Sequence, residues 1–333
     1  MRHANLILQK GQRIMKSAYP PQPGHGIKAS EASLVKRLMK YKFSYLLISG
    51  ALVWTLIFCY LPMFGLVMAF QEFSIFKGFT GSKFVGLDNF IEIFTQPNFL
   101  KAILNTLHYN SVILFLGFPF PILLALLFNE LKNVFFKKIV QTVSYLPYFL
   151  SWISVVALFY SFFEMNGPFN DLKTMLAGQA IERTNILMNP DNFLGILFGS
   201  HLWKNLGWSS VIFIAAIAGI DPNLYEAATV DGCGRFKQAM YITIPGILPT
   251  VMIIFILSTS SLVSSNFEQV FGFQNLYTME QTQVINTLVY KIGIQQGNYS
   301  IATAFGLAQG VVSFMIVYVA NRISRRLSNI GIW

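Results

Sequence analysis

The residues that could do chemistry in this chain are few, and none forms a catalytic pattern. The long apolar stretches hold essentially no Asp or Glu, and none carries paired carboxylates, a histidine cluster or a Ser/Lys pair at catalytic spacing. Cys59 and Cys233 have no partner at metal-ligand spacing. No Gly-rich phosphate loop ending in Lys-Ser/Thr occurs. We therefore predict a non-catalytic chain that binds no cofactor or metal of its own.

Polar side chains inside apolar segments are the next candidates, because such groups are costly in lipid unless they are paired or face a cavity. The run 258–266 is unusually rich in hydroxyl and amide groups, among them Ser261, Ser265 and Asn266. A sugar pathway needs such groups, since sugar hydroxyls both donate and accept hydrogen bonds. Helix–helix packing by small polar residues explains the same run equally well.

Four further residues could belong to such a pathway. Tyr145 and Trp152 could stack on sugar rings, although most aromatic side chains of membrane helices face lipid or other helices. Lys204 and Asn205 lie well inside an apolar stretch. Lys204 could line a wet cavity and favour an anionic sugar such as a uronate, but the sequence favours a lysine that snorkels outward. The predicted pathway is Tyr145, Trp152, Lys204, Asn205, Ser261, Ser265 and Asn266.

A polar loop at 221–245 predicts two short helices joined at a glycine. Asp221 followed by Pro222 is a helix N-cap with proline at the first helical position. Gly232 is a natural stop, and Pro245 and Pro249 should end a second helix before the membrane. Small alanines permit close approach by a partner, whereas the alternative is an amphipathic helix lying on the bilayer. The proposed contact residues are Glu226, Ala227, Ala228, Asp231, Gly232, Arg235 and Pro245.

The elements that must position these residues are long apolar helices. The 333-residue chain is 54% hydrophobic and only 11% charged, whereas a soluble domain carries about a quarter charged residues. A helix needs about 20 apolar residues to cross the hydrocarbon core. We predict an all-α membrane protein with six transmembrane helices, at about 45–70, 102–128, 139–163, 194–220, 247–265 and 301–320.

Basic residues flank these predicted spans unevenly. Lys and Arg gather before the first span, between the second and third, between the fourth and fifth, and after the sixth, whereas the other loops carry mixed charge. By the positive-inside rule both termini are cytoplasmic. The formal net charge of +10 fits membrane lipid better than nucleic acid, because the basic residues do not gather on one soluble face.

The loop resembles the signature loop of ABC importer permeases. That pattern is Glu-Ala-Ala, three residues, Gly, nine residues, Ile, one residue, a Leu-like residue and Pro. This chain has Glu226-Ala227-Ala228, Gly232, Ile242 and Pro245, with Ile244 where leucine is commoner. The resemblance implies a coupling helix that docks in a cleft of an ATPase subunit.

Three other segments resemble sugar-uptake permeases in general: Val85–Phe90, Asn105-Thr106 and Leu124–Asn129. Two more, Gln141–Trp152 and Ala320–Leu327, resemble the narrower LplB-like, MalF-related branch for oligosaccharides and polysaccharide fragments. The resemblance implies the type I importer permease fold in the bacterial cytoplasmic (inner) membrane. It also implies as partners a second homologous permease, two ABC ATPase subunits that bind ATP and Mg, and an extracytoplasmic solute-binding protein.

The expected organisation is a cytoplasmic tail with an amphipathic helix at 1–42, a permease domain at 43–327 and a C-terminal tail at 328–333. A secondary transporter or a channel for a small polar solute is the alternative function. A secondary transporter would carry buried acidic residues or interrupted helices in paired positions. A channel fits poorly with a docking loop. Copurification with an ATPase subunit distinguishes these alternatives.

Overall fold

The computed structural model describes residues 39–179 and 182–332, and the chain divides into two units, 1–64 and 65–333. The cytoplasmic tail and helix expected at 1–42 lie outside the described residues except for residues 39–42. In the first unit, helix α3 at Lys42–Thr55 continues into the π-helical turn η1 at Leu56–Tyr60. Neither buries a residue, and a helix that is apolar all round suits lipid or another membrane helix.

The second unit is helical apart from one small antiparallel hairpin, in which Gln71 of β1 lies opposite Phe84 of β2. The 3-10 helix η2, Leu61–Phe70, leads into it. The elements that follow are, in chain order, β1 Gln71–Glu72, α4 Gly78–Gly81, β2 Lys83–Phe84, α5 Asp88–Thr95, α6 Pro97–Gly117, α7 Pro119–Glu130, α8 Val134–Tyr145, η3 Leu146–Phe149, α9 Trp152–Phe163, α10 Pro168–Ala177, η4 Ile186–Met188, η5 Pro190–Asn192, α11 Phe193–Ala218, α12 Pro222–Val230, α13 Arg235–Gln238, η6 Ala239–Thr243, α14 Ile244–Ser258, η7 Thr259–Val263, α15 Phe267–Phe273, α16 Met279–Thr282, α17 Ile285–Tyr290, η8 Lys291–Gln295 and α18 Tyr299–Ser328.

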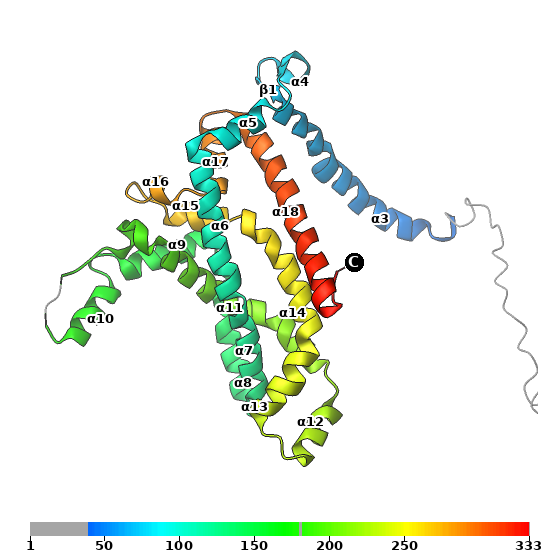
Figure 1. The fold of residues 1–333 in the computed structure, drawn as a ribbon, viewed down its shortest axis with the longest axis vertical. Helices are drawn as coiled ribbons and strands as arrows, with labels where there is room; N and C mark the ends of the chain where they lie inside the picture. Colours follow the sequence, from blue (N-terminus) through cyan, green and yellow to red (C-terminus); the bar gives the residue numbers. More distant parts are fainter. Residues whose placement is uncertain (1–38, 180–181, 333) are drawn as a thin grey trace, which may run out of the picture. The chain divides into compact units, whose positions relative to one another are not determined.

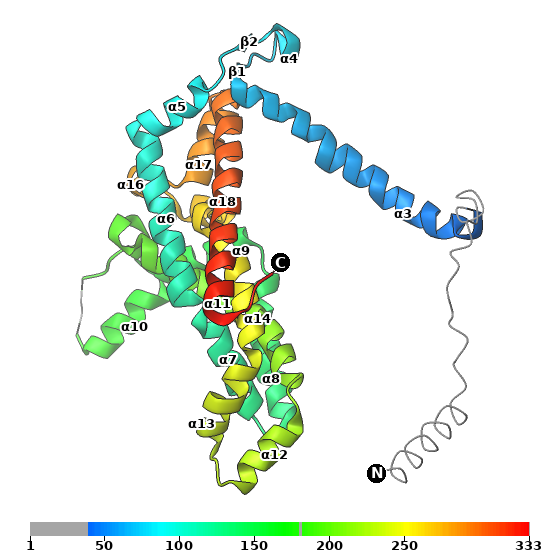
Figure 2. The ribbon, with the colours of Figure 1, turned by 45° about the vertical axis from the view of Figure 1, so that its right-hand side comes forward.

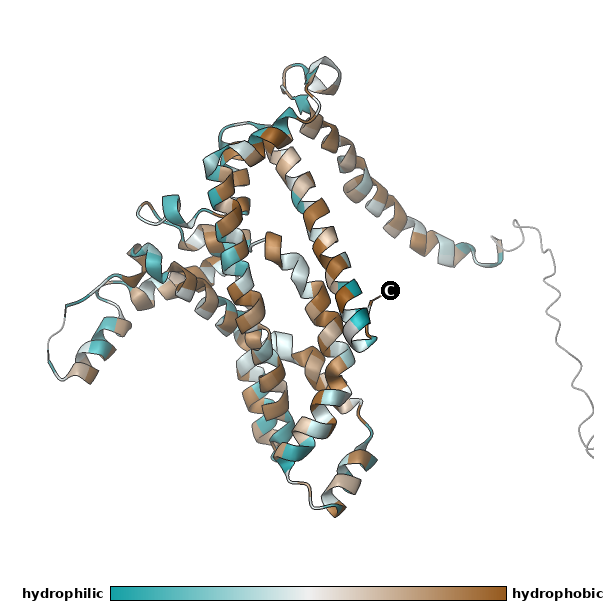
Figure 3. Ribbon diagram, viewed as in Figure 1, coloured by the Kyte–Doolittle hydropathy of each residue, from teal (hydrophilic) through white to brown (hydrophobic). Residues whose placement is uncertain are grey.

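Four helical stretches in the described chain are long and apolar enough to cross a membrane, and up to six if each of two bent helix pairs is one span. The four stretches are Lys42–Phe70, Pro97–Glu130, Arg235–Val263 and Tyr299–Arg326, and the bent pairs join α8–η3 to α9–α10 and η5–α11 to α12. Hydrophobic residues predominate along these stretches (Figure 3).

The third predicted span, 139–163, is not one continuous helix. The chain leaves the helix at Leu150, and Ser151 caps a new helix, α9, by accepting a hydrogen bond at its Oγ from Ser154 N–H. The two arms are bent by 101°. Pro147, at the start of η3, and a serine with N-cap preference are the local causes.

The prediction that Pro245 and Pro249 end the second loop helix is wrong. α13, η6 and α14 follow one another without a break, with Pro245 in the first turn of α14 and Pro249 inside it. A proline inside a helix removes one hydrogen bond and clashes with a carbonyl of the preceding turn. The π-helical turn η6 immediately precedes α14, and such turns absorb backbone irregularities of this kind.

Helix α11 is central to the packing of the second unit. It supplies residues to two of the three buried clusters: one with α6, α9 and α15, the other with α7 and α14. The third cluster joins α5, α6, α17 and α18. In both ribbon views α12 and α13 lie at the end of this unit opposite α4 and α5 (Figure 1, Figure 2).

Candidate functional site

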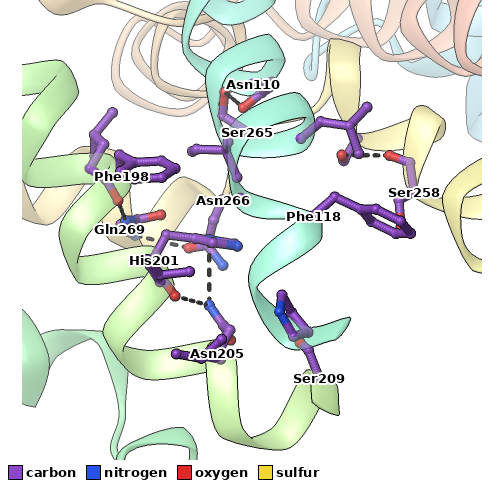
Figure 4. A pocket seen from close by; sticks show the side chains of 18 of the residues that line it. Asn110, Phe118, Phe198, His201, Asn205, Ser209, Ser258, Ser265, Asn266 and Gln269 are labelled. Carbon is purple, nitrogen blue, oxygen red and sulfur yellow. Dashed lines mark hydrogen bonds between the residues drawn. The ribbon is translucent and has the colours of Figure 1, made fainter. Parts of the chain in front are cut away.

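A cavity of about 600 Å³ lies between α6, α7, α11, α14, η7 and α15. Its lining combines apolar side chains such as Phe118 and Phe213 with polar ones (Figure 4). The polar lining residues are Tyr109, Asn110, His201, Asn205, Ser209, Ser258, Ser261, Ser264, Ser265, Asn266 and Gln269. Apolar walls with a few convergent polar groups are typical of a small-molecule site.

Four of the seven residues predicted for the substrate pathway line this cavity: Asn205, Ser261, Ser265 and Asn266. The run 258–266 reaches the cavity because α14 tightens into the 3-10 helix η7. Ser258 and Ser261 donate their hydroxyl protons to Ile254 O at 2.8 Å and to Ser258 O at 2.7 Å. Their lone pairs therefore remain as acceptors for a sugar hydroxyl.

Buried amides brace the wall of the cavity. Ser265 Oγ donates to Asn110 Oδ1 at 3.3 Å, which joins the end of the polar run to α6. Gln269 donates both amide hydrogens to α11, to Leu197 O at 2.8 Å and to Ser200 Oγ at 2.9 Å. The sequence prediction missed Asn110 and Gln269. Asn110 was detectable as a lone amide inside the second predicted span, where an unpaired amide is costly.

Tyr145, Trp152 and Lys204 are absent from the cavity lining. Successive residues of a helix point about 100° apart. Asn205 and His201, four residues apart, therefore share the cavity face of α11, whereas Lys204 projects toward the junction of η3 and α9. Tyr145 is the last residue of α8 and directly precedes η3.

Lys204 is buried, with 6% of its surface exposed, so the prediction of a snorkelling lysine is wrong. Its Nζ donates to Tyr148 O at 2.7 Å and to Leu150 O at 2.5 Å, and lies 5.5 Å from the centre of the Trp152 ring. Two carbonyls left free where the third span breaks are thus satisfied by one ammonium group. A cation at a helix C-terminus is also favoured by the helix dipole.

Close packing against α11 also holds the end of α8 and the η3 segment in place. Tyr148 stacks on Trp208 of α11 with ring centres 4.7 Å apart. A methyl group at Gly207 would collide with the backbone of Ser144, so the backbones of α8 and α11 touch. Glycine at a helix–helix contact is the usual device for such close approach in membranes.

The 221–245 loop has the predicted N-cap and glycine stop. Asp221 Oδ1 accepts from Asn223 N–H at 3.0 Å. At the other end Gly232 has φ +75°; its N–H donates to Thr229 O and the Cys233 N–H donates to Ala228 O. These two bonds form a Schellman motif, which needs a residue in the left-handed conformation and favours glycine.

The loop is braced from inside and exposed outside. Gln238 Nε2 donates to Thr229 Oγ1 at 3.0 Å, and Tyr225 shares a 2.9 Å hydrogen bond with Thr243. Arg235 forms a 3.5 Å ion pair with Glu130 at the end of α7. Of the residues predicted to contact a partner, Ala228 is half-buried, and the others are exposed: Glu226, Ala227, Asp231, Gly232, Arg235 and Pro245.

Large apolar side chains surround these contact residues. Val230 is 88% exposed and Phe236 is 77% exposed. Apolar groups exposed on a braced loop are available for contact with a partner. Among the described residues, no group of three or more His, Cys, Asp or Glu could hold a metal ion.

Long apolar helices around a polar cavity, with a braced and exposed loop at one end, are an arrangement that suits a membrane transport protein. The chain belongs to the family described as "binding-protein-dependent transport system inner membrane component", whose model matches residues 117–329. It is therefore a multi-pass inner-membrane transport component. The family predicted from the loop is confirmed.

Several relatives are similar over nearly the full length of the chain. The polygalacturonan/rhamnogalacturonan transport system permease protein YteP of Bacillus subtilis is 38% identical, covering 92% of this chain and 95% of that protein. Protein LplB of Bacillus subtilis is 37% identical, covering 90% and 94%. The name of the first relative describes a transport permease.

A solved structure has the same fold. A chain of the bacterial alginate ABC transporter, crystallised in complex with its alginate pentasaccharide-bound periplasmic protein, is 36% identical. The match covers 89% of this chain and 99% of that chain, with a TM-score of 0.80. The chain described here thus has the all-helical fold of that importer permease.

Proposed function

We propose that this chain is the membrane permease subunit of an ATP-driven importer that takes up sugars as oligosaccharides or polysaccharide fragments. The observation that carries the proposal is the joint presence of a hydroxyl- and amide-lined cavity and an exposed Glu226–Gly232 docking loop. The similarity to permeases named for polygalacturonan, rhamnogalacturonan and alginate transport supports the substrate class.

In the proposed topology six spans cross the membrane, and both termini and the 221–245 loop are cytoplasmic. Each bent helix pair then contributes one span, with α12 projecting from the membrane at the end of the fourth. The opposite positions of α12 and of α4–α5 in the second unit support this arrangement (Figure 1). The permease domain occupies 43–327, between the short cytoplasmic tails 1–42 and 328–333.

The chain performs no chemistry in this proposal, so its partners supply the energy. Two ABC ATPase subunits bind ATP and Mg, and one of them receives the coupling loop. A second, homologous permease completes the pathway, and an extracytoplasmic protein delivers the sugar. The alginate importer structure, which contains a periplasmic protein, supports this set of partners.

ATP-driven closure of the ATPases would push on the loop and favour the outward-facing arrangement of helices. The loop can transmit such a push because Tyr225 of α12 hydrogen-bonds Thr243 of η6, and Gln238 of α13 hydrogen-bonds Thr229 of α12. Binding energy changes the balance between two arrangements only by contacting them differently. The helical segments α13 and η6 lead directly into α14, so a displacement of α12 would be passed on to that span.

Copurification tests the proposal. The chain, tagged and expressed with its genomic neighbours, should retain an ATPase subunit through purification in mild detergent. Val230→Asp and Phe236→Asp together should weaken that retention, since charges replace exposed apolar contacts, while Tyr277→Asp, on an exposed aromatic far along the chain in 267–298, should not. An ion-driven solute carrier would purify without any ATPase.

A further inference from the structure

Some polar side chains of the cavity already use their donor hydrogens in bonds within the protein, and others do not. This difference indicates which ligand groups the cavity can bind. Ser258 and Ser261 have donated their protons to the helix backbone, and Gln269 has committed both amide hydrogens. Asn205 has also used both, toward His201 O at 2.9 Å and His201 Nδ1 at 3.4 Å. Much of the polar lining therefore offers acceptors.

His201 is held as a hydrogen-bond donor toward the cavity. A backbone carbonyl can only accept, so the Asn205 group 2.9 Å from His201 O must be its NH₂. The same NH₂ faces Nδ1, which must then accept, and the proton of the neutral ring lies on Nε2. Nε2 has no hydrogen-bond partner among the described residues, and His201 lines the cavity (Figure 4).

Asn266 provides a second N–H donor. It caps α15, its Oδ1 accepting from Gln269 N–H at 2.9 Å. That bond orients the amide and leaves Nδ2 without a partner in the described part of the chain. Free hydroxyls such as that of Ser264 can turn to donate or accept, so they do not discriminate between ligands.

The described lining also carries no fixed negative charge that would repel an anion. No Asp, Glu, Lys or Arg is among the described residues that line the cavity, and Glu268, two residues after Asn266, is exposed outside it. A carboxylate accepts hydrogen bonds and cannot donate them, so it needs N–H groups and the absence of other anions.

We infer that His201 Nε2–H and the Asn266 amide bind the carboxylate of an acidic sugar, so that this cavity selects uronate-bearing oligosaccharides. The inference rests on the proposed function and narrows its substrate class. The sequence offered the acid-binding role to Lys204, whereas this inference assigns it to His201, three residues earlier in α11, and to Asn266 at the start of α15. A related importer structure is described as handling the acidic polysaccharide alginate.

The test compares uptake of galacturonate oligomers with uptake of carboxyl-reduced oligomers of equal length, in proteoliposomes of the full assembly with its binding protein. His201→Phe removes the donor and should lower acidic uptake by about tenfold or more, as expected for losing a hydrogen bond to a charged group. Neutral uptake should fall much less. His108→Gln, an exposed histidine on α6 outside the cavity, is the matched control.

Asn266→Asp makes the second test without disturbing the helix cap, because Asp caps helices as well as Asn does. The new carboxylate faces the cavity and should lower acidic uptake far more than neutral uptake. Equal loss of both sugars, or unchanged acidic uptake in both variants, overturns the inference. Wild-type uptake of neutral oligomers alone also overturns it but leaves the proposed function standing, whereas uptake of neither sugar refutes the proposed function.

Discussion

Lys204 and its neighbour Asn205 have different roles, because Lys204 bonds backbone carbonyls and Asn205 lines the cavity. The sequence grouped Lys204 with Asn205 because both are polar and lie inside an apolar segment. The helix places Asn205 in the cavity and Lys204 against the carbonyls of Tyr148 and Leu150. Polarity was readable from sequence, but the side of α11 that faces the cavity depends on where the other helices pack.

Lys204→Met should destabilise the chain by about 1–3 kcal/mol, because it keeps the side-chain volume and leaves two buried carbonyls unpaired. The apparent melting temperature of the purified protein in detergent measures this effect. Lys173→Met, at an exposed lysine of α10, should leave that temperature nearly unchanged. Equal melting temperatures for the two variants would contradict the bracing role of Lys204.

At the scale of elements, the helices were predictable and their interruptions were not. Long charge-free stretches predict where apolar helices run, since a charge inside lipid is costly. The break after Leu150 depends on a tertiary contact from Lys204, which lies fifty-four residues later in the chain and bonds the Leu150 carbonyl. The helix passes through Pro245 and Pro249 next to the π-helical turn η6. Composition alone reveals neither the distant partner nor the π-helical turn.

The α8–α11 contact should tolerate no side chain at Gly207. Gly207→Ala should lower the apparent melting temperature, since its methyl group collides with the Ser144 backbone and overpacking typically costs about 1–3 kcal/mol. Gly199→Ala in the same helix meets nothing within 4 Å and is the matched control. A Gly207→Ala protein as stable as Gly199→Ala would mean that the two backbones do not touch.

The coupling loop depends on the backbone conformation of Gly232. A methyl group there meets nothing within 4 Å, but φ is +75°, a region that costs a β-branched residue roughly 1–2 kcal/mol or more. Gly232→Val should abolish sugar uptake while membrane insertion stays normal. Gly234→Ala has equal space and φ −69°, so it should transport normally. Full uptake by the valine variant would refute the docking role.

At the scale of the whole molecule, the proposed orientation rests on two observations, the distribution of basic residues and the arrangement of the helices. The basic loops predict that the 221–245 loop is cytoplasmic, and the structure separates that loop from α4 and α5 within the second unit. The family and the all-helical fold were predictable, because the signature loop and the charge-free stretches are local in sequence. The cavity was predictable only in part, since its other walls come from helices far apart in the chain.

Cysteine labelling tests the orientation. In a Cys59→Ser/Cys233→Ser background, Asn223→Cys should react with a membrane-impermeant maleimide only from the cytoplasmic side. Tyr277→Cys, at a position 68% exposed in the wild-type chain, should react only from the outside. The reverse pattern would contradict the proposed topology.

The most direct test of the central claim is ATP hydrolysis by the purified assembly in lipid, with and without oligosaccharides presented by its binding protein. The proposal predicts that hydrolysis rises when a sugar-loaded binding protein is added, and most with an acidic oligosaccharide. A chain that purifies without any ATPase activity, or an assembly whose hydrolysis no sugar changes, would contradict the assignment as the permease of an ATP-driven sugar importer.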